Sequence, residues 1–466
     1  MRFRTSLLLG SAFVAGAISV SALRPLQHAL GVGLLPPALA DAMPGKASTN
    51  TAETYRMLSL FGDVFERVRA DYVDPVTDKK LIENALNGML TGLDPHSMYM
   101  TPKQFHDMNV QTRGEFGGLG IEVTSDHGIV KVISPIDGTP AAKAGIKSGD
   151  FIVGVDGKSV EGDSLNDVVH MIQGKPGTKI TLTIKRPSVA KPLVFPMTRE
   201  VITIQVVKSQ LEPGSIGYIR IAQFTDQTDP GVRKAYAALT RQAGGKLKGL
   251  VLDLRNNPGG LLDQAIAVSD DFIKDGEIVS TRARHPQDSQ RWNARGEDLT
   301  HGLPIAVLTN AGTASASEIV SGALQDHRRA VIVGTRTFGK GSVQTVIPLP
   351  DGGGMRLTTA RYYTPSGRSI QGLGITPDVV VHEDDTAPIL APQREADLQG
   401  AITNVGGAPQ STLPPRTDLP AIVKTIPQKP PKGWPAFDPS KPTTDFQLQE
   451  ALKVVTAMEP PAHVAN

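Results

Sequence analysis

Residues 305–319 read IAVLTNAGTASASEI, and the fold of the chain follows from this stretch. It begins with an apolar run, Ile305–Leu308, of the kind typical of a buried strand. Small residues follow, and the apolar spacing becomes that of a helix at Ser317–Gln325. A strand that turns directly into a helix is the repeating unit of α/β folds. The stretch therefore predicts an α/β layer that continues on both sides of it.

The same alternation extends from residue 201 to residue 382. Apolar runs predict further strands, and helical spacing recurs between them. We therefore interpret residues 201–382 as one α/β core with a largely buried sheet. Further strands are expected at Tyr218–Ile221, Leu250–Leu254 and Val331–Val333, and further helices at Val232–Gln242 and Leu261–Phe272.

Two regions precede this core. Residues 41–110 show helical periodicity and predict a helical N-terminal region. Residues 111–200 hold short β-type runs around one helical segment, Ser164–Gln173, and predict a separate compact domain. Its strands are expected at Ile129–Ile133, Phe151–Val155 and Ile180–Ile184.

The two ends of the chain predict an exported protein with a loosely organised tail. In residues 1–40, Arg2 and Arg4 precede an apolar run, and Ala38-Leu39-Ala40 is a candidate cleavage site, which together predict a signal peptide. The alternative is an uncleaved N-terminal anchor, because the run is near the lower limit for a membrane span. Residues 383–466 are rich in Pro, Thr, Ala and Gln, which predicts a mobile tail with one terminal helix at Phe446–Met458.

Composition and motif content argue against several classes of protein. Lys and Arg total 48 and Asp and Glu total 46, so the chain lacks the excess of positive charge typical of nucleic-acid binders. It has no cysteine, which excludes disulfides and a cysteine nucleophile. No two of its ten histidines have the H-E-x-x-H spacing of a zinc protease, and G-x-S-x-G is absent.

Ser315 lies where the predicted strand turns into a helix. A hydroxyl at a helix N-terminus is close to free backbone N–H groups, which can stabilise a developing oxyanion. Small neighbours let a substrate backbone approach. The alternative interpretation is structural, because Ser315 and Glu318 also have the spacing of a capping box.

Lys340 lies in the segment GTRTFGKGSVQ, residues 334–344. This segment approaches the phosphate-binding loop of nucleotide-binding proteins, but Gly341 replaces the required hydroxyl and a strand-like run follows. A buried lysine can instead act as a general base, because burial disfavours its charged form. Gln344 lies four residues further on and could orient the amine through its carbonyl. The alternative for Lys340 is a solvated surface charge.

Asp253–Gly260 reads DLRNNPGG and follows another predicted strand. Its paired glycines, Gly259 and Gly260, would let a backbone N–H group point into a site. The alternative is a tight turn.

Taken together, these segments resemble the carboxyl-terminal processing (tail-specific) proteases, which are serine peptidases. The match is carried by DLRNNPGG at 253–260, SASEI at 315–319 and TFGKGSVQ at 337–344, with LDPHS at 93–97 and YYTPSG at 362–367. It extends from about residue 54 to residue 382, and Lys340 follows Ser315 by 25 positions, as in that family.

The resemblance implies a role for each site residue. Ser315 would be the nucleophile, Lys340 the general base and Gln344 its orienting partner. The amide of Ala316, with that of Gly259 or Gly260, would form the oxyanion hole. It implies an α/β protease core with crotonase/ClpP-like β–α layers, an inserted PDZ domain and a helical N-terminal region, and neither a metal nor another cofactor.

Residues 111–200 resemble a PDZ domain. Gly118, Leu119, Gly120 and Ile121 correspond to its carboxylate-binding loop, which holds a peptide C-terminus while the peptide adds as a strand. The helix near 164–173 would form the far wall of the groove. The expected partners are therefore protein substrates with apolar C-termini, and no nucleic acid.

The sequence therefore predicts an exported serine endopeptidase, placed in the bacterial periplasm as a soluble or inner-membrane-anchored protein. Two alternatives stay open: a catalytically silent PDZ scaffold and a nucleotide-binding P-loop protein. A homo-oligomer and an adaptor protein are expected by family analogy alone.

Overall fold

The structure is a computed structural model that describes residues 51–126, 128–296, 298–384, 393–404, 415–438 and 441–458. The chain divides into two compact units, residues 1–78 and 79–466. The described part of the first unit is mainly helix α1, Thr51–Asp71. The predicted signal segment, residues 1–40, lies outside the described residues. From Thr51 onward, no described helix is long and apolar enough to cross a membrane.

The second unit is built on a six-stranded sheet whose order is β10-β11-β12-β15-β16-β19. Strand β10 runs antiparallel to β11, and the other neighbours pair in parallel. This is the α/β core that the alternation of strands and helices predicts. The strands are β10 (Val207–Glu212), β11 (Ile216–Ile221), β12 (Gly249–Asp253), β15 (Ile305–Thr309), β16 (Val331–Gly334) and β19 (Val379–Val380).

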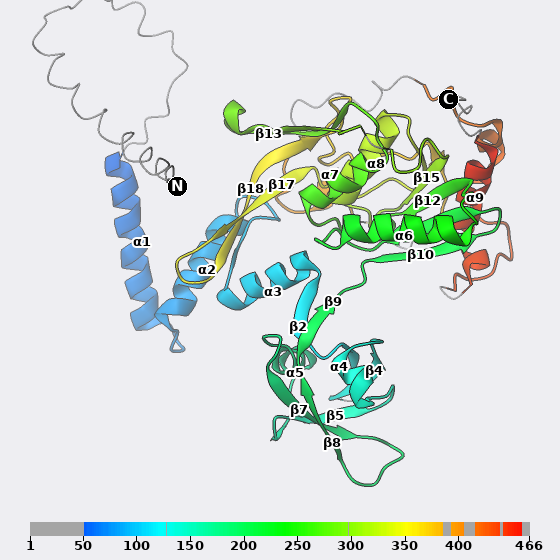
Figure 1. Ribbon diagram of the computed structural model, residues 1–466. Helices are drawn as coiled ribbons and strands as arrows, with labels where there is room; N and C mark the ends of the chain where they lie inside the picture. The colour runs from blue at the N-terminus through cyan, green and yellow to red at the C-terminus, as the bar shows by residue number, and fades with distance from the viewer. Residues whose placement is uncertain are drawn as a thin grey trace, which may run out of the picture. The chain divides into compact units, whose positions relative to one another are not determined.

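Both faces of this sheet are covered, which explains why its strands are continuous apolar runs. On β12, Leu250 and Leu252 pack toward helices on one face, whereas Val251 packs toward the other face, because side chains alternate along a strand. The first face is covered by α6 (Thr228–Gln242), α7 (Leu262–Asp270) and α8 (Ala316–Asp326), and the second by α9 (Phe446–Ala457) (Figure 1).

A second sheet joins distant parts of the chain. Strand β18 (Gly354–Tyr363) pairs with β17 (Ser342–Pro348), β13 (Glu277–Ala283) and β1 (Met98–Met100), and β13 also pairs with β14 (Arg291–Asn293). Because β1 directly follows the LDPHS segment, this pairing places residues 93–97 against the hairpin that follows Lys340. Helices α2 (Asp78–Thr91) and α3 (Pro102–Arg113) flank β1 in the sequence.

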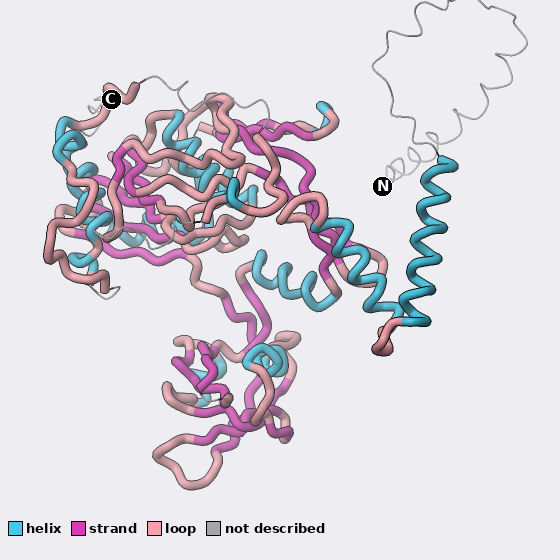
Figure 2. The backbone as a smooth tube through the Cα atoms, turned by 180° about the vertical axis from the view of Figure 1, so that it is seen from behind, coloured by secondary structure: helices cyan, strands magenta, loops and turns pink. Residues whose placement is uncertain are grey.

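Residues 121–198 form a smaller β-domain with its own apolar core. The domain is entered through β2 (Glu115–Gly118) and left through β9 (Glu200–Thr203), which pair antiparallel (Figure 2). Its strands are β3 (Ile121–Asp126), β4 (Ile129–Pro135), β5 (Phe151–Val155), β6 (Lys158–Ser159), β7 (Lys179–Lys185) and β8 (Leu193–Thr198), and its helices are α4 (Pro140–Ala144) and α5 (Leu165–Ile172).

The described parts of residues 383–466 are packed against the core, so the expected mobile tail is wrong for them. Arg416 forms an ion pair with Asp378 at 3.0 Å. The ring of Trp434 meets that of Phe446 edge-on, with centroids 5.1 Å apart. Buried ion pairs and ring contacts hold a Pro-rich segment in place even though it lacks helical or strand periodicity. The predicted terminal helix is present as α9.

Candidate active site

Three loops with predicted site residues follow neighbouring strands of the core sheet. Loop 254–260 follows β12, loop 310–315 follows β15, and loop 335–341 follows β16. These strands are parallel, so their carboxyl ends lie at one edge of the sheet, where sites in α/β folds form. The topology therefore brings together segments that the sequence separates by up to 80 residues.

Ser315 lies immediately before α8 in a strained backbone conformation. Its φ of 55° and ψ of −114° place a non-glycine residue in a region that L-amino acids rarely adopt. Such strain is concentrated at functional turns. The amide of Ala316, the first of α8, donates to no acceptor among the described residues, whereas the N–H groups of Ser317 and Glu318 already donate to the carbonyls of Ala314 and Ser315.

The two candidate oxyanion glycines differ in their surroundings. A Cβ on Gly259 would lie 2.8 Å from Ser315 Cβ and 2.9 Å from Ala316 N, so Gly259 borders the predicted nucleophile directly. A Cβ on Gly260 would instead lie 2.0 Å from Phe224 O. The Gly259 N–H donates to Asn257 Oδ1 at 2.9 Å, so this amide must turn before it can bind an oxyanion. The structure thus favours Gly259 over Gly260 as the neighbour of Ser315.

Lys340 is largely buried at the end of its loop. Burial lowers the pKa of its amine, and Arg356 lowers it further, whereas the carboxylates of Glu395, Glu318 and Asp94 raise it; the net shift is downward. Within the described part of the chain, no hydrogen bond joins its Nζ to Ser315 Oγ or to Gln344. Strand β17 follows Lys340, where a phosphate-binding loop would require a helix.

Glu318 joins the nucleophile loop to the lysine loop. Its fully buried carboxylate accepts the backbone N–H groups of Ser315 at 2.8 Å, Gly339 at 2.7 Å and Lys340 at 2.8 Å. The hydroxyl of Thr337 also donates to it. Burial raises the pKa of Glu318 to about 7, although each of these donors acts to lower it. The sequence suggested only a helix cap here, so this bridging role was missed.

Gln344 lies on β17, beyond the loop that bears Lys340. Its Nε2 donates to Ser342 Oγ at 3.0 Å and to Thr358 Oγ1 at 3.3 Å. Thr358 Oγ1 in turn donates to Asp94 of the LDPHS segment at 3.1 Å. The side-chain amide of Gln344 is therefore held by these partners rather than by the lysine. Asp94 therefore lies close to Gln344, although it was not predicted as a site residue. Only the pairing of β1 with β18 brings it there, and the sequence alone did not indicate that pairing.

Asp253 anchors the loop that ends at Gly259. This fully buried carboxylate binds Arg255 at 2.6 Å, Tyr218 OH at 2.7 Å and Arg220 at 3.3 Å. Burial alone would raise the pKa of Asp253, but the nearby Arg255 outweighs this effect and the net shift is downward. Arg255 also binds Asp445, the residue that caps α9. The first residues of DLRNNPGG are therefore structural.

The predicted carboxylate-binding loop lies between β2 and β3. Leu119 is buried in the core of the small domain. Gly120 has a φ of 72°, and its carbonyl accepts the N–H of Ile136 at 2.9 Å. Helix α5 packs on the same core, as a groove wall would.

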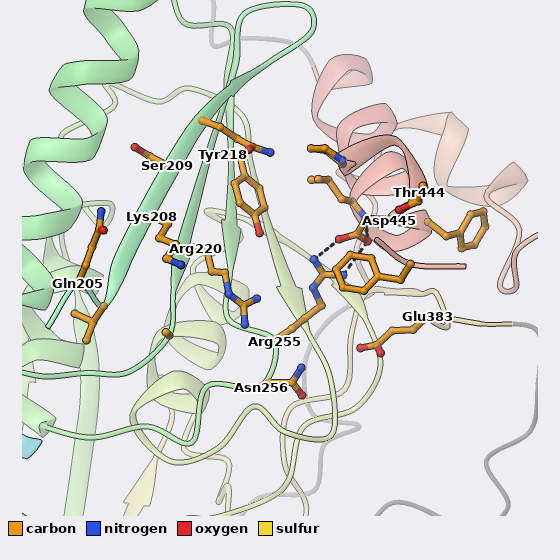
Figure 3. A pocket seen from close by; sticks show the side chains of 17 residues that line it. Gln205, Lys208, Ser209, Tyr218, Arg220, Arg255, Asn256, Glu383, Thr444 and Asp445 are labelled. Carbon is orange, nitrogen blue, oxygen red and sulfur yellow. Dashed lines mark hydrogen bonds and ion pairs between the residues drawn. The ribbon is translucent and has the colours of Figure 1, made fainter. Parts of the chain in front are cut away.

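A cavity of about 560 Å³ opens beside loop 254–260 (Figure 3). Lys208, Arg220 and Asn256 provide polar groups on one side, and Phe437 and Phe446 line it with apolar rings. Strand β10, which lines it, is at the end of the strand order, so one of its edges has no partner strand in the described residues. Charge, apolar surface and an open strand edge together suit a peptide segment.

Three protein-family models match separate parts of the chain. Residues 215–381 match the model of peptidase family S41, and residues 131–186 match that of the PDZ domain. Residues 38–104 match the N-terminal domain of the activating protease CtpB.

Individual relatives cover most of the chain. A carboxy-terminal-processing protease of Bartonella bacilliformis is 51% identical over 88% of this chain and 90% of the relative. The carboxy-terminal processing protease CtpA of Bacillus subtilis is 35% identical over 76% of this chain and 74% of that protein. Among solved structures, a photosystem II D1 C-terminal processing protease is 34% identical over 69% of this chain and 92% of its own, with a TM-score of 0.40.

Proposed function

Because this chain belongs to the carboxy-terminal processing proteases and is a serine-type peptidase with a PDZ domain, we propose that it cleaves proteins through a Ser315–Lys340 dyad after binding their C-terminal region. The observation that carries this proposal is the shared carboxylate of Glu318. It fixes the backbones of Ser315 and Lys340 to one point while the lysine side chain is buried.

The reaction follows from the chemistry of these two side chains. Neutral Lys340 takes the proton of Ser315 Oγ as the oxygen attacks the substrate carbonyl. The resulting C–N bond cleavage requires a proton on the leaving amine, which Lys340 returns. Water, deprotonated by the same amine, then hydrolyses the acyl-enzyme and regenerates Ser315. Burial lowers the pKa of the Lys340 amine, which supports this role, because a neutral amine can accept a proton and an ammonium cannot.

The oxyanion is held by backbone amides in this proposal. Ala316 supplies one amide at the N-terminus of α8, where the helix dipole also favours negative charge. Gly259 supplies the second after its N–H turns away from Asn257. Substrate binding provides the free energy for that turn, which links catalysis to the presence of a substrate.

Two further surfaces take up the polypeptide. The Gly118–Ile121 loop binds the terminal carboxylate of a substrate with an apolar C-terminus. The cavity beside loop 254–260 holds a more distant segment of the same chain, where Lys208 favours acidic side chains. The sequence of residues 1–40 supports export to the periplasm, where unfolded protein substrates are present.

The experiment compares single variants on an unfolded protein with an apolar C-terminus. Ser315→Ala and Lys340→Ala should each abolish cleavage and also labelling by a fluorophosphonate probe. Lys234→Ala, on the exposed side of α6, is the matched control and should leave both unchanged. Near-full activity of Lys340→Ala would show that the base is another group. If a substrate with an amidated C-terminus is cleaved as fast as one with a free carboxylate, the proposed carboxylate binding by the Gly118–Ile121 loop is contradicted.

A further inference from the structure

Glu395 reaches the lysine loop from outside the region that matches the peptidase family model. It lies in segment 393–404, whereas that match ends at residue 381. Its side chain is fully buried, and its backbone N–H donates to Phe338 O at 3.2 Å, two residues before Lys340. A buried carboxylate in a short, otherwise exposed segment needs partners that compensate its charge.

Two such partners lie on different parts of the chain. His96 Nε2, from the LDPHS segment, lies 2.9 Å from each carboxylate oxygen of Glu395. Gln371 Nε2 donates to Glu395 Oε1 at 3.0 Å. The other end of the Gln371 amide accepts the N–H of Gly341 at 3.0 Å. Glu395 is therefore connected to the residue that follows Lys340 as well as to the loop that precedes it.

The charged groups that face Lys340 come from four parts of the fold. Arg356 on β18 opposes the ammonium form, whereas Glu395, Glu318 on α8 and Asp94 favour it, and Glu395 is the strongest of these three. The carbonyl of His96 accepts the Nε–H of Arg356 at 2.9 Å. One residue, His96, thus holds both the arginine and the glutamate whose opposite charges act on the lysine.

We propose that Glu395 is a positioning residue for Lys340, which it holds through Phe338 and Gln371 and whose charge it balances against Arg356 in concert with His96. This inference rests on the proposed function, because it assumes that Lys340 is the general base. It gives the C-terminal segment a task in the reaction, which is to hold the lysine loop together with Glu318.

The direction of the effect follows from the charges. A carboxylate near an amine stabilises its protonated form and so raises its pKa. Glu395→Gln removes the negative charge but keeps the size and the carbonyl oxygen of the side chain. The amine of Lys340 should then lose its proton at lower pH, and the rising limb of the pH–rate profile should move in the same direction. Arg356→Gln should move it to higher pH.

The experiment measures the rate at which a fluorophosphonate phosphonylates Ser315 Oγ, with loss of fluoride, between pH 5 and pH 10 in the full chain. For Glu395→Gln we expect the midpoint to fall by about one pH unit, the scale of one nearby charge. Asp397→Asn is the matched control, because it removes an exposed carboxylate from the same segment and should leave the midpoint in place. Thermal unfolding of each variant reports on folding separately.

The outcomes are distinct. An unmoved midpoint in Glu395→Gln together with a lower melting temperature would reduce Glu395 to a structural residue and overturn the inference. If that variant does not fold, an unshifted midpoint in Arg356→Gln overturns it instead. If Lys340→Ala loses labelling but the midpoints of Glu395→Gln and Arg356→Gln do not move, the result supports the dyad and contradicts only this inference. Retained labelling in Lys340→Ala would instead remove the dyad itself.

Discussion

Ser315 and Lys340 donate their backbone N–H groups to the same oxygen, Oε2 of Glu318, at 2.8 Å each. The two residues are 25 positions apart and lie in different loops. A shared acceptor restricts how far these loops can move relative to each other. Positioning of this kind matters because displacements of about 1 Å can cost about 100-fold in rate.

Glu318→Gln should therefore misalign the proposed dyad of Ser315 and Lys340. The amide places an NH₂ group where a carboxylate oxygen accepts backbone N–H groups, so at least one of these hydrogen bonds is lost. We expect kcat/KM to fall by about 100-fold, measured on an unfolded protein substrate. Asp263→Asn, an exposed carboxylate in the first turn of α7, is the control and should have little effect.

The same variant has a pH signature in stability. The folded-state pKa of Glu318, about 7, lies above its ordinary value of 4.5, so the folded protein holds this proton more tightly than the unfolded chain. The free energy of unfolding therefore decreases for wild type, relative to Glu318→Gln, as pH rises from 4.5 to 7. Urea titrations of both proteins between pH 4.5 and pH 7 measure this difference in the free energy of unfolding. A constant difference would show that Glu318 is ionised throughout.

Gly259→Ala should impair catalysis far more than stability. The added Cβ would lie 2.8 Å from Ser315 Cβ, so Ser315 must move. We expect a loss in kcat of about 100-fold or more with a smaller change in KM. Gly244→Ala is the matched control, since it also has positive φ, 65°, but has open space around it. Both should lose roughly 1–2 kcal/mol of stability from the strained backbone, and Gly259→Ala somewhat more, because its Cβ also meets the backbone of Ala314 and Ala316. Comparable activity in the two variants would contradict the placement of Gly259.

Asp253→Asn should lower the free energy of unfolding, because Asp253 stabilises the carboxyl end of β12 in the core sheet. The substitution leaves the buried Arg255 with only Asp445 as a charged partner, and breaking buried ion pairs typically costs about 3 kcal/mol. The pKa of Asp253 lies below its ordinary value, so its stabilisation is present above about pH 4 and is lost as pH falls through the folded-state value. Urea unfolding should thus separate wild type from variant at pH 7 and less so below pH 3.

The control for this measurement is Asp288→Asn, an exposed carboxylate near β14. It should change the unfolding free energy little at either pH. A difference between wild type and Asp253→Asn that persists unchanged below pH 3 would argue that packing, and not charge, supplies the stabilisation.

Lys208→Ala should weaken the binding of acidic substrates. Lys208 lines the cavity and forms no ion pair within the described residues, so its charge is available to a ligand. We expect KM for a peptide with acidic residues to rise about fivefold, equivalent to about 1 kcal/mol, with kcat unchanged. Added salt should reduce the effect. Lys234→Ala serves as the control, and an equal effect on neutral peptides would exclude charge recognition.

Much of the fold follows from local patterns. The apolar runs at 250–254, 305–308 and 331–333 predict β12, β15 and β16, because strands buried on both faces must be apolar throughout. Helices α6, α8 and α9 follow from helical spacing. The tail could not be predicted in this way, because Arg416 and Trp434 are held by contacts with distant residues and not by any periodicity.

The candidate site, like the fold, has features that the sequence predicts and features that depend on contacts between distant residues. By itself, the sequence determined the family, through the motifs around Ser315 and Lys340, and with it the class of reaction. The roles of these two residues in the reaction are our proposal. Only the tertiary structure decided which groups surround them. From the sequence, Glu318 was expected to be a helix cap and Gln344 the partner of the lysine, and Glu395 fell within the predicted mobile tail. Sequence spacing predicts contacts only between residues that are close along the chain. Charge interactions and hydrogen bonds depend on distance in space. Parallel strands bring residues that are far apart in the sequence to one edge of the sheet, so these contacts could be found only in the tertiary structure.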